Sequence, residues 1–123
     1  MTNDNKQKSI LIIDDNKSIT DMLSNYLTLK NFSCDVASDG KSGLDMIRKK
    51  KYDTIFLDLS MPDFSGFNVI ESLEKNGMIK NLNIIVLTAS AIKKEEIQGI
   101  LQRGIKICIK KPLNLAELVK LIS

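Results

Sequence analysis

Carboxylates stand at the ends of two apolar segments of this sequence. Asp14 and Asp15 follow the apolar run 10–13, and Asp58 ends the run that begins at Thr54. In an open parallel sheet, chemistry takes place beyond the carboxyl ends of the strands, so both runs would deliver their acids to the same edge. Two unit charges about 4 Å apart repel by about 4 kcal/mol at an effective dielectric constant of roughly 20, so such a group requires a cation. Oxygen ligands suit Mg²⁺, and the pattern therefore predicts phosphate chemistry in an acidic pocket.

Two further strand ends carry groups that suit the same chemistry. Thr88 ends the apolar run 83–88 and is followed by Ala89, whereas Lys111 follows the last apolar run and directly precedes Pro112. Each group taken alone has a simpler explanation, because acids and hydroxyls also cap helices and lysines also occupy solvated turns. Four such groups at one edge of one sheet favour a shared site over coincidence.

The composition is that of one globular domain. The chain has 123 residues, of which 43% are apolar and 27% charged, and its net charge is +3. This length suffices for one ordinary core. The chain contains no histidine, which excludes histidine zinc sites, Ser-His-Asp triads and a phosphohistidine within it. Cys34 and Cys108 fall in separate strand candidates without metal-type spacing, and we expect both to remain unpaired thiols.

The basic and terminal segments point to neither a nucleic-acid partner nor a membrane. The basic run 48–51 lies at the expected end of a helix, where cations complement the helix dipole, and no aromatic residues are interleaved with it. The apolar stretches are shorter than the ~20 residues of a membrane helix, and the first residues are not of the secretory type. We expect a short disordered tail over 1–8, one folded domain over 9–122, and a cytoplasmic location.

Apolar runs and amphipathic stretches alternate five times along the chain. This alternation predicts an α/β fold in which right-handed crossovers build a parallel sheet. The first, third and fourth runs are almost continuously apolar, as in strands covered on both faces, whereas the second and fifth include the polar residues typical of edge strands. The expected strands lie near 9–14, 33–37, 53–58, 83–88 and 105–109.

The segments between these strands have the apolar spacing of helices. We expect the second helix to begin after Asp39-Gly40 and the third to be entered through Pro62 and Gly66. Gly104 would end the fourth helix, and Asn114, with Glu117 three residues later, would cap the fifth. The first helix is predicted by the spacing of Ile19, Met22, Leu23, Tyr26 and Leu27.

In combination, these motifs resemble the receiver domain of two-component response regulators, and closely the single-domain, chemotaxis-type kind. The resemblance covers roughly residues 9–122. It implies a flavodoxin-like (βα)₅ doubly wound sandwich whose five-stranded parallel sheet has the order 2-1-3-4-5. It also implies that the Lys-Pro peptide bond is commonly cis. The motifs that carry it are Asp14-Asp15, Asp58 with Leu59-Ser60-Met61-Pro62 and Gly66 after it, Thr88-Ala89 and Lys111-Pro112.

The resemblance assigns a role to each acid. Asp58 would be the phosphoacceptor, the nucleophile that takes a phosphoryl group. Asp15, Asp58 and the backbone carbonyl of Ser60 would hold Mg²⁺ (or Mn²⁺), with Asp14 binding it through water. The resemblance therefore implies that phosphorylation depends on a divalent cation.

The other strand-end groups would meet the phosphoryl oxygens. The Lys111 ammonium, the Thr88 hydroxyl and the Ala89 backbone amide would share the charge of the transition state with the metal ion. That transition state is loose and places its charge on the equatorial oxygens, so positioning and electrostatics would supply the rate. The protein would catalyse only its own phosphorylation and dephosphorylation, and would not otherwise be an enzyme.

The resemblance also implies partners. A sensor histidine kinase, a phosphotransfer protein or a small phosphodonor would supply the phosphoryl group, which this histidine-free chain cannot supply to itself. Phosphorylation would change a surface at about 92–122, through which a downstream protein target would bind. We expect a monomer within a phosphorelay, with no direct contact with nucleic acid and no membrane insertion.

One position departs from the family pattern, and two others stand where side chains affect the lifetime of the phosphate. Cys108 stands where the family often has Tyr or Phe as a rotamer switch coupled to Thr88, and a thiol cannot sweep the same volume. Ser60 and Ser90 stand where side chains tune the lifetime of the phosphate, and both are short. We therefore expect hydrolytic water to reach the phosphoryl group without a strong steric block.

Three alternatives remain open. One is a degenerate receiver that acts only as an interaction scaffold, a possibility raised by Cys108. Another is an aspartyl-phosphate phosphatase of the haloacid dehalogenase type, but that family requires a second Asp where Ser60 stands. The third is a flavin-binding carrier of the same fold, which would need a phosphate-cradling loop where the acids Asp14 and Asp15 would repel one.

Overall fold

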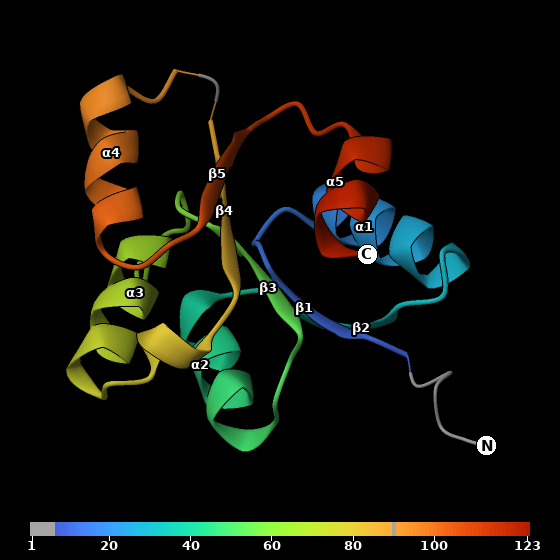
Figure 1. Cartoon of the computed structure of the whole chain (residues 1–123), viewed down its shortest axis with the longest axis horizontal. Coiled ribbons are helices and arrows are strands. Elements are labelled where there is room, and N and C mark those ends of the chain that lie inside the picture. Colours follow the sequence, from blue (N-terminus) through green and yellow to red (C-terminus); the bar gives the residue numbers. More distant parts are fainter. Residues whose placement is uncertain (1–6, 90) are drawn as a thin grey trace.

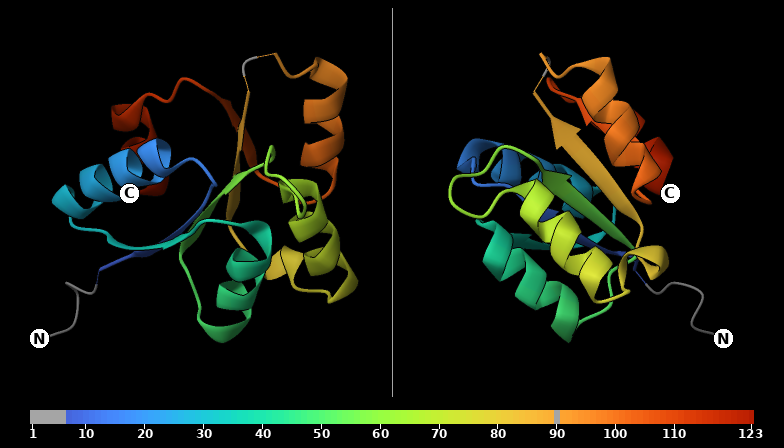
Figure 2. Two further views of the ribbon diagram at one scale, coloured as in Figure 1. Left: turned by 180° about the vertical axis from the view of Figure 1, so that it is seen from behind. Right: turned by 90° about the vertical axis from the view of Figure 1, so that its left-hand side faces the viewer.

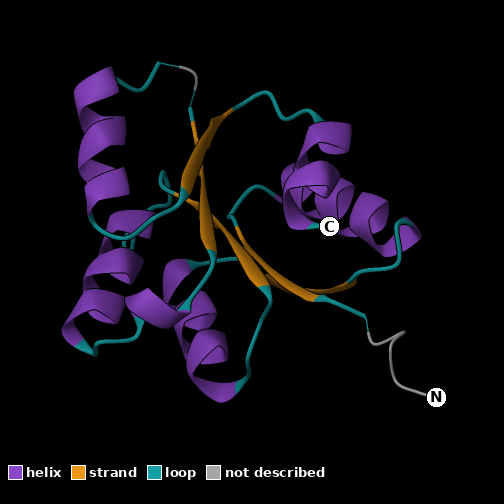
Figure 3. Ribbon diagram, in the orientation of Figure 1, coloured by secondary structure: helices purple, strands orange, loops and turns teal. Residues whose placement is uncertain are grey.

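Five parallel strands form one sheet in the computed structural model, which describes residues 7–89 and 91–123. Their order is β2-β1-β3-β4-β5, which confirms the order that the resemblance to receiver domains implied (Figures 1 and 3). Most of the predicted tail over 1–8 lies outside the described residues. The strands are β1 (Ser9–Ile13), β2 (Ser33–Ala37), β3 (Thr54–Asp58), β4 (Ile84–Thr88) and β5 (Ile107–Lys110).

Helices cover both faces of this sheet. Two of them, α1 and α5, lie side by side on one face, while α2, α3 and α4 cover the other (Figures 1 and 2). A short 3₁₀ helix, η1 (Ile79–Asn81), precedes β4 and was not predicted. The α-helices are α1 (Lys17–Leu29), α2 (Gly40–Lys49), α3 (Gly66–Lys75), α4 (Lys94–Gln102) and α5 (Leu115–Ile122).

The strand period of two divides the apolar side chains of β1 between two cores. Leu11 and Ile13 pack with the α2 and α3 side, whereas Ile10 and Ile12 pack against α1 and α5. Every residue of β3 and β4 is buried. The strands β2 and β5 are only partly buried and form the two edges, so the prediction drawn from their polar residues is confirmed.

Short polar side chains begin most of the helices. Asn16 caps α1, Asp39 caps α2, Ser65 caps α3 and Asn114 caps α5, each side chain accepting a backbone N–H bond in the first turn. Asn16 therefore caps α1, and helix capping, the simpler explanation for an acid at this strand end, does not account for Asp15. The helix α4 begins after Lys93, so no cap role remains for the strand-end threonine.

The fifth strand begins later than the sequence indicated. The expected range was 105–109, but pairing with β4 starts only where Ile85 faces Ile107. Gly104 follows α4 with a φ of 98°, a conformation that suits glycine, and it ends the helix as expected. The buried Ile105 therefore belongs to the connection from α4 rather than to the sheet, although its apolar character resembled a strand.

Three smaller observations complete the fold. Cys34 and Cys108 are both free, as expected for residues on opposite edge strands. The Lys111–Pro112 peptide bond is cis. Among the described residues, none of the helices has both the length and the apolar character needed to cross a membrane.

Candidate functional site

The carboxylates of Asp14, Asp15 and Asp58 meet at the carboxyl edge of the sheet. One oxygen from each lies within 4.8 Å of the others. The register of β1 and β3 explains this meeting. Ile13 of β1 pairs with Leu57 of β3, and the residue that follows each of them is an acid, Asp14 or Asp58. We call these three residues the acid cluster. Two of its members are buried, with relative exposures of 1% for Asp14 and 3% for Asp58, whereas Asp15 is exposed.

One ammonium group, on the residue that follows β5, reaches the acid cluster. The Nζ atom of Lys111 lies 3.1 Å from Oδ2 of Asp14 and 3.3 Å from Oδ1 of Asp58. The backbone N–H of Lys111 donates to the carbonyl of Thr88 at 2.8 Å, which ties the start of the β5–α5 loop to the end of β4. One cation thus faces three carboxylates, and the described side chains leave an excess of negative charge.

Burial and the excess of negative charge shift the pKa values of Asp58 and Lys111. The pKa of Asp58 is raised, first because burial disfavours its charged form and second because of the nearby charge of Asp14. The Lys111 ammonium and the backbone N–H of Ser60 act in the opposite direction. For Lys111, burial tends to lower the pKa, but its bonds to the two carboxylates outweigh burial and raise it. A cation entering here would lower the cost of keeping Asp58 ionised.

The end of β4 lies beside this group. Thr88 is buried at 1% relative exposure, and its hydroxyl donates to the carbonyl of Ala89 at 3.2 Å. The neighbouring register, in which Asp58 pairs with Leu87, places Thr88 and Ala89 at the same edge as the acids. The predicted site residues are therefore brought to one edge of the sheet. Ser90, for which a role in phosphate lifetime was expected, lies outside the described residues.

The loop after Asp58 is fixed by a glycine. A Cβ atom at Gly66 would collide with the backbone carbonyl of Asp58 and with Cα of Leu59, so the start of α3 packs directly against the backbone of Asp58. The N–H of Gly66 also donates to the carbonyl of Leu59 at 3.2 Å. Sequence reasoning placed this glycine only at the helix entry, whereas the structure shows that it permits the close approach of α3 to the backbone of Asp58 and Leu59.

Cys108 lies on the α4 side of β5, next to Val86 of β4. It is half-buried, and burial raises the pKa of its thiol, which favours the neutral form. A small neutral side chain therefore occupies the position where the family often has an aromatic ring.

A hollow of about 330 Å³ opens beside the acid cluster. Asp15 belongs to both the hollow and the acid cluster, whereas Asp14 and Asp58 do not line the hollow. We call this cavity the entry hollow; it is lined by Asp15, Ser38, Asp39, Lys41, Met61, Pro62, Asp63 and Phe64. Sequence reasoning missed its β2–α2 side, although the argument used for β1 and β3 applies equally to the residues that follow β2.

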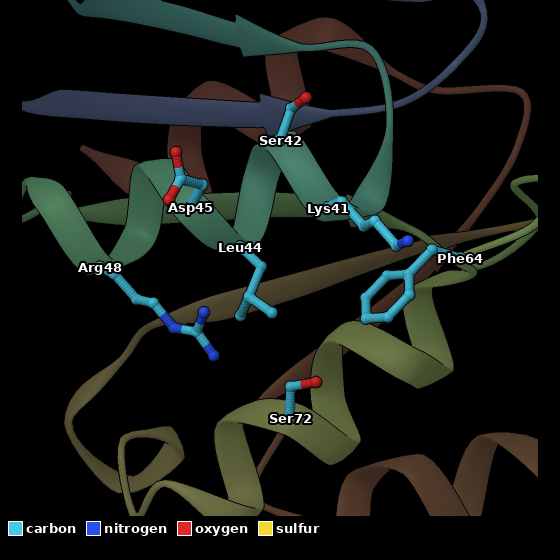
Figure 4. A pocket seen from close by; sticks show the side chains of 7 residues that line it. All are labelled: Lys41, Ser42, Leu44, Asp45, Arg48, Phe64 and Ser72. Carbon is cyan, nitrogen blue, oxygen red and sulfur yellow. The ribbon is translucent and has the colours of Figure 1, made fainter.

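A second, wider groove of about 560 Å³ lies between α2 and α3. Figure 4 shows Leu44 and Arg48 pointing from α2 towards Ser72 on α3, with Lys41 and Phe64 at the other end. Lys41 and Phe64 line both the groove and the entry hollow, and they therefore stand between the two.

Comparison with known proteins agrees with this architecture. The model of the response regulator receiver domain matches residues 10–123. The response regulator MprA of Mycolicibacterium vanbaalenii is 34% identical over 110 residues, which cover 89% of this chain and 46% of that protein. The chain therefore spans about half the length of the curated relatives it matches.

Solved structures show the same fold. The chemotaxis protein CheY4 of Vibrio cholerae superposes with a TM-score of 0.84 at 27% identity, covering 94% of this chain and 96% of that one. A Francisella response regulator receiver domain has the same TM-score at 28% identity, covering 94% and 93% of the two chains. The chain belongs to the response regulator receiver domain family. Receiver domains are the phosphoacceptor modules of two-component signalling and act with a histidine kinase or phosphotransfer partner.

Proposed function

We propose that Asp58 is the phosphoacceptor of this receiver domain and that its phosphorylation depends on a divalent cation. The observation that carries the proposal is the placement of a buried carboxylate at the end of β3, beside Asp14 and Asp15 and within 3.3 Å of the Lys111 ammonium. In the transfer, an Asp58 oxygen forms a bond to phosphorus while the bond from phosphorus to the donor breaks. The leaving group departs with the electron pair.

The donor set fits Mg²⁺ (or Mn²⁺). The cluster offers carboxylate oxygens only, and its negative charge exceeds that of the one ammonium beside it. Asp15, Asp58 and the backbone carbonyl of Ser60 would hold the ion, with Asp14 binding it through water. A bound ion would supply positive charge to the phosphoryl oxygens and would make ionised Asp58 less costly.

The chain itself supplies the remaining contacts to the phosphoryl group. Lys111 already lies between two carboxylates, so its ammonium can follow the negative charge when Asp58 gains a phosphoryl group. The Thr88 hydroxyl is engaged with a carbonyl and would rotate towards the new oxygens, which the Ala89 amide would also contact. No general base is needed, because an ionised carboxylate is already a nucleophile.

The phosphoryl group would come from a histidine kinase, a phosphotransfer protein or a small phosphodonor. Its arrival would bias the surface at about 92–122, comprising α4, β5 and α5, towards a form that binds a downstream protein. The packing of α4 supports this choice of surface, since Ile100 is its one fully buried residue. A cytoplasmic location, a monomeric state and the lack of any other enzymatic activity stay predictions.

The phosphorylated state would be of limited lifetime. Ser60 is exposed and short, so no bulky side chain at this position screens the acceptor from water. We expect a half-life well below days at neutral pH, measured by the decay of the phosphate adduct after the donor is removed. Decay over days would show that another group shields the site.

The direct test of this function is intact mass measurement after incubation with acetyl phosphate and Mg²⁺. The wild-type chain should gain one phosphoryl group, and Asp58→Ala should gain none. Omission of Mg²⁺ with a chelator present should abolish the adduct on the wild type. An adduct on Asp58→Ala would place the acceptor elsewhere, and an adduct that forms equally well without divalent cations would contradict the role of the acid cluster.

A further inference from the structure

The entry hollow carries charged groups that the proposed phosphotransfer does not use. Beyond Asp15 of the acid cluster, its charged lining consists of Asp39, Asp63 and one cation, Lys41. All three of these residues are exposed, and none of them forms an ion pair within the described part of the chain. The surface next to the proposed acceptor thus combines two exposed carboxylates with one exposed ammonium, and the charge of Lys41 acts on Asp39.

The structure fixes the positions of these charges. Asp39 accepts the N–H of Ser42 at 2.7 Å as the cap of α2, and this bond lowers the pKa of Asp39, so it is ionised at neutral pH. The Nζ atom of Lys41 lies 5.9 Å from the centre of the Phe64 ring, and Figure 4 shows its side chain extended towards that ring. Cation–π attraction at an exposed site is weak, so it only favours a position of the solvent-exposed ammonium beside the hollow.

The ring itself is held by close packing. A Cβ atom at Gly40 would collide with the backbone carbonyl of Phe64, so the start of α2 is in direct contact with the loop that follows β3. Because α2 carries Asp39 and Lys41 while the loop carries Asp63 and Phe64, this contact holds the two walls of the hollow together.

We propose that the entry hollow is the path by which phosphodonors reach Asp58, and that Lys41, opposed by Asp39 and Asp63, makes phosphorylation selective for the charge of the donor. This inference rests on the proposed function of Asp58. Lys41 attracts an anionic donor towards the acids, whereas the two carboxylates repel it. These residues do not touch the reacting atoms; they act on the concentration and orientation of the donor.

The size of the effect follows from electrostatics across water. One unit charge about 8 Å from a doubly charged anion changes its local concentration about sixfold in water without salt, and screening over a Debye length of about 10 Å at 0.1 M reduces this to about twofold. A donor with one net charge should feel roughly the square root of that factor. The same field acts with the opposite sign on a cation that enters the site.

The first test measures initial phosphorylation rates with two donors. Lys41→Gln should slow phosphorylation by acetyl phosphate about threefold at low salt, and Asp63→Asn should accelerate it by a similar factor. Asp63 has a φ of 65°, which asparagine also tolerates, so this substitution removes charge without new backbone strain. Both changes should be smaller with phosphoramidate, which carries less negative charge, and both should diminish as salt is added.

The second test measures Mg²⁺ affinity of the unphosphorylated variants by calorimetry. Lys41→Gln should bind Mg²⁺ more tightly than the wild type, and Asp63→Asn more weakly, each by a few-fold. A substitution that only disturbed the fold would weaken Mg²⁺ binding and slow phosphorylation together. Changes of opposite sign for the cation and the anionic donor therefore identify a charge effect. Lys75→Gln and Glu71→Gln, both exposed on α3 and outside the hollow, serve as matched controls.

The outcomes separate this inference from the function on which it rests. If the wild type is phosphorylated on Asp58 but the Lys41 and Asp63 variants behave like the α3 controls, the entry hollow is not the path and the acceptor assignment stands. Changes of rate that persist unaltered in high salt would also overturn the charge mechanism. If Asp58 takes no phosphoryl group at all, both the function and this inference fail.

Discussion

The carboxyl edge of the sheet at Asp58, which is the proposed acceptor edge, and the α4 side of the molecule are packed very differently. Every residue of β3 is buried, and Gly66 brings the start of α3 against the backbone of Asp58. In α4, by contrast, Ile100 is the one fully buried residue, Leu101 is 39% exposed, and a side chain at Gly99 would meet no atom within 4 Å. Elements with few buried contacts open most easily. The difference indicates that the backbone around Asp58 is rigid and that α4 opens more easily.

Two glycine substitutions test this contrast most strongly. Gly66→Ala should lower the free energy of unfolding by about 3 kcal/mol, because its Cβ would collide with backbone that has no room to move. Gly99→Ala should raise it by about 0.5–1 kcal/mol, because it adds helix propensity in open space. Urea denaturation of both variants gives the two values. Effects of equal size and the same sign would contradict the difference in packing between Gly66 and Gly99.

A divalent cation should stabilise the acceptor edge. Because the acid cluster exists only in the folded chain, Mg²⁺ at about 100 times its dissociation constant should add about 2.7 kcal/mol to the free energy of unfolding. The melting temperature should rise with Mg²⁺ concentration, and Asp15→Asn should weaken this response. A melting temperature that is unchanged at millimolar Mg²⁺ would count against the metal site.

Removing the charge of Asp58 should relieve its repulsion with Asp14, which a bound divalent cation would otherwise offset. Without divalent cations at neutral pH, Asp58→Asn should stabilise the fold by an amount on the order of 1 kcal/mol. The pKa of Asp58 is raised in the folded state, so its charge costs stability above that pKa, and the cost disappears as the pH falls towards the unfolded value of 3.8.

The pH profile therefore has a definite sign. The advantage of Asp58→Asn over the wild type should shrink on acidification through the raised pKa, as measured by thermal denaturation at a series of pH values. Added Mg²⁺ should reduce or reverse this advantage at neutral pH. A variant less stable than the wild type under metal-free conditions would show that Asp58 is not under repulsion.

The smallest effect concerns the link between the two regions. Arg103, at the end of α4, pairs with Glu74 near the end of α3, with its Nε atom 3.2 Å from both carboxylate oxygens. Both side chains are about one-third exposed, so Glu74→Gln should cost only about 0.5–1 kcal/mol. Hydrogen exchange should increase in α4 more than in α3. Uniform exchange in both helices would show that the pair does not anchor α4.

Much of this molecule follows from the sequence because its signals are local and repeated. The continuous apolar runs of β1, β3 and β4 indicate central strands and the polar residues of β2 and β5 indicate edges, while the full strand order was implied by the resemblance to receiver domains. The meeting of Asp14 and Asp58 then follows, because neighbouring parallel strands end at the same edge. These predictions depend on chain direction and period, which sequence determines directly.

Other features depend on contacts between distant segments. The start of β5 was misplaced because buried Ile105 looks the same in sequence whether it lies in a strand or in a connection. The packing of Gly66 against Asp58 and the place of Lys41 in the entry hollow depend on how α2 and α3 approach the loop after β3. A single sequence carries no signal for such an approach.

The most direct measurement of the central claim is to locate the acyl phosphate in the chain. Borohydride reduces an aspartyl phosphate to homoserine, so phosphorylated protein can be reduced, digested and sequenced by mass spectrometry. We predict homoserine at position 58, formed only when the donor and Mg²⁺ are both present and reduced in yield by Lys111→Ala. Homoserine at any other aspartate, or a yield that does not depend on Mg²⁺, would contradict the assignment of Asp58 as a metal-dependent phosphoacceptor.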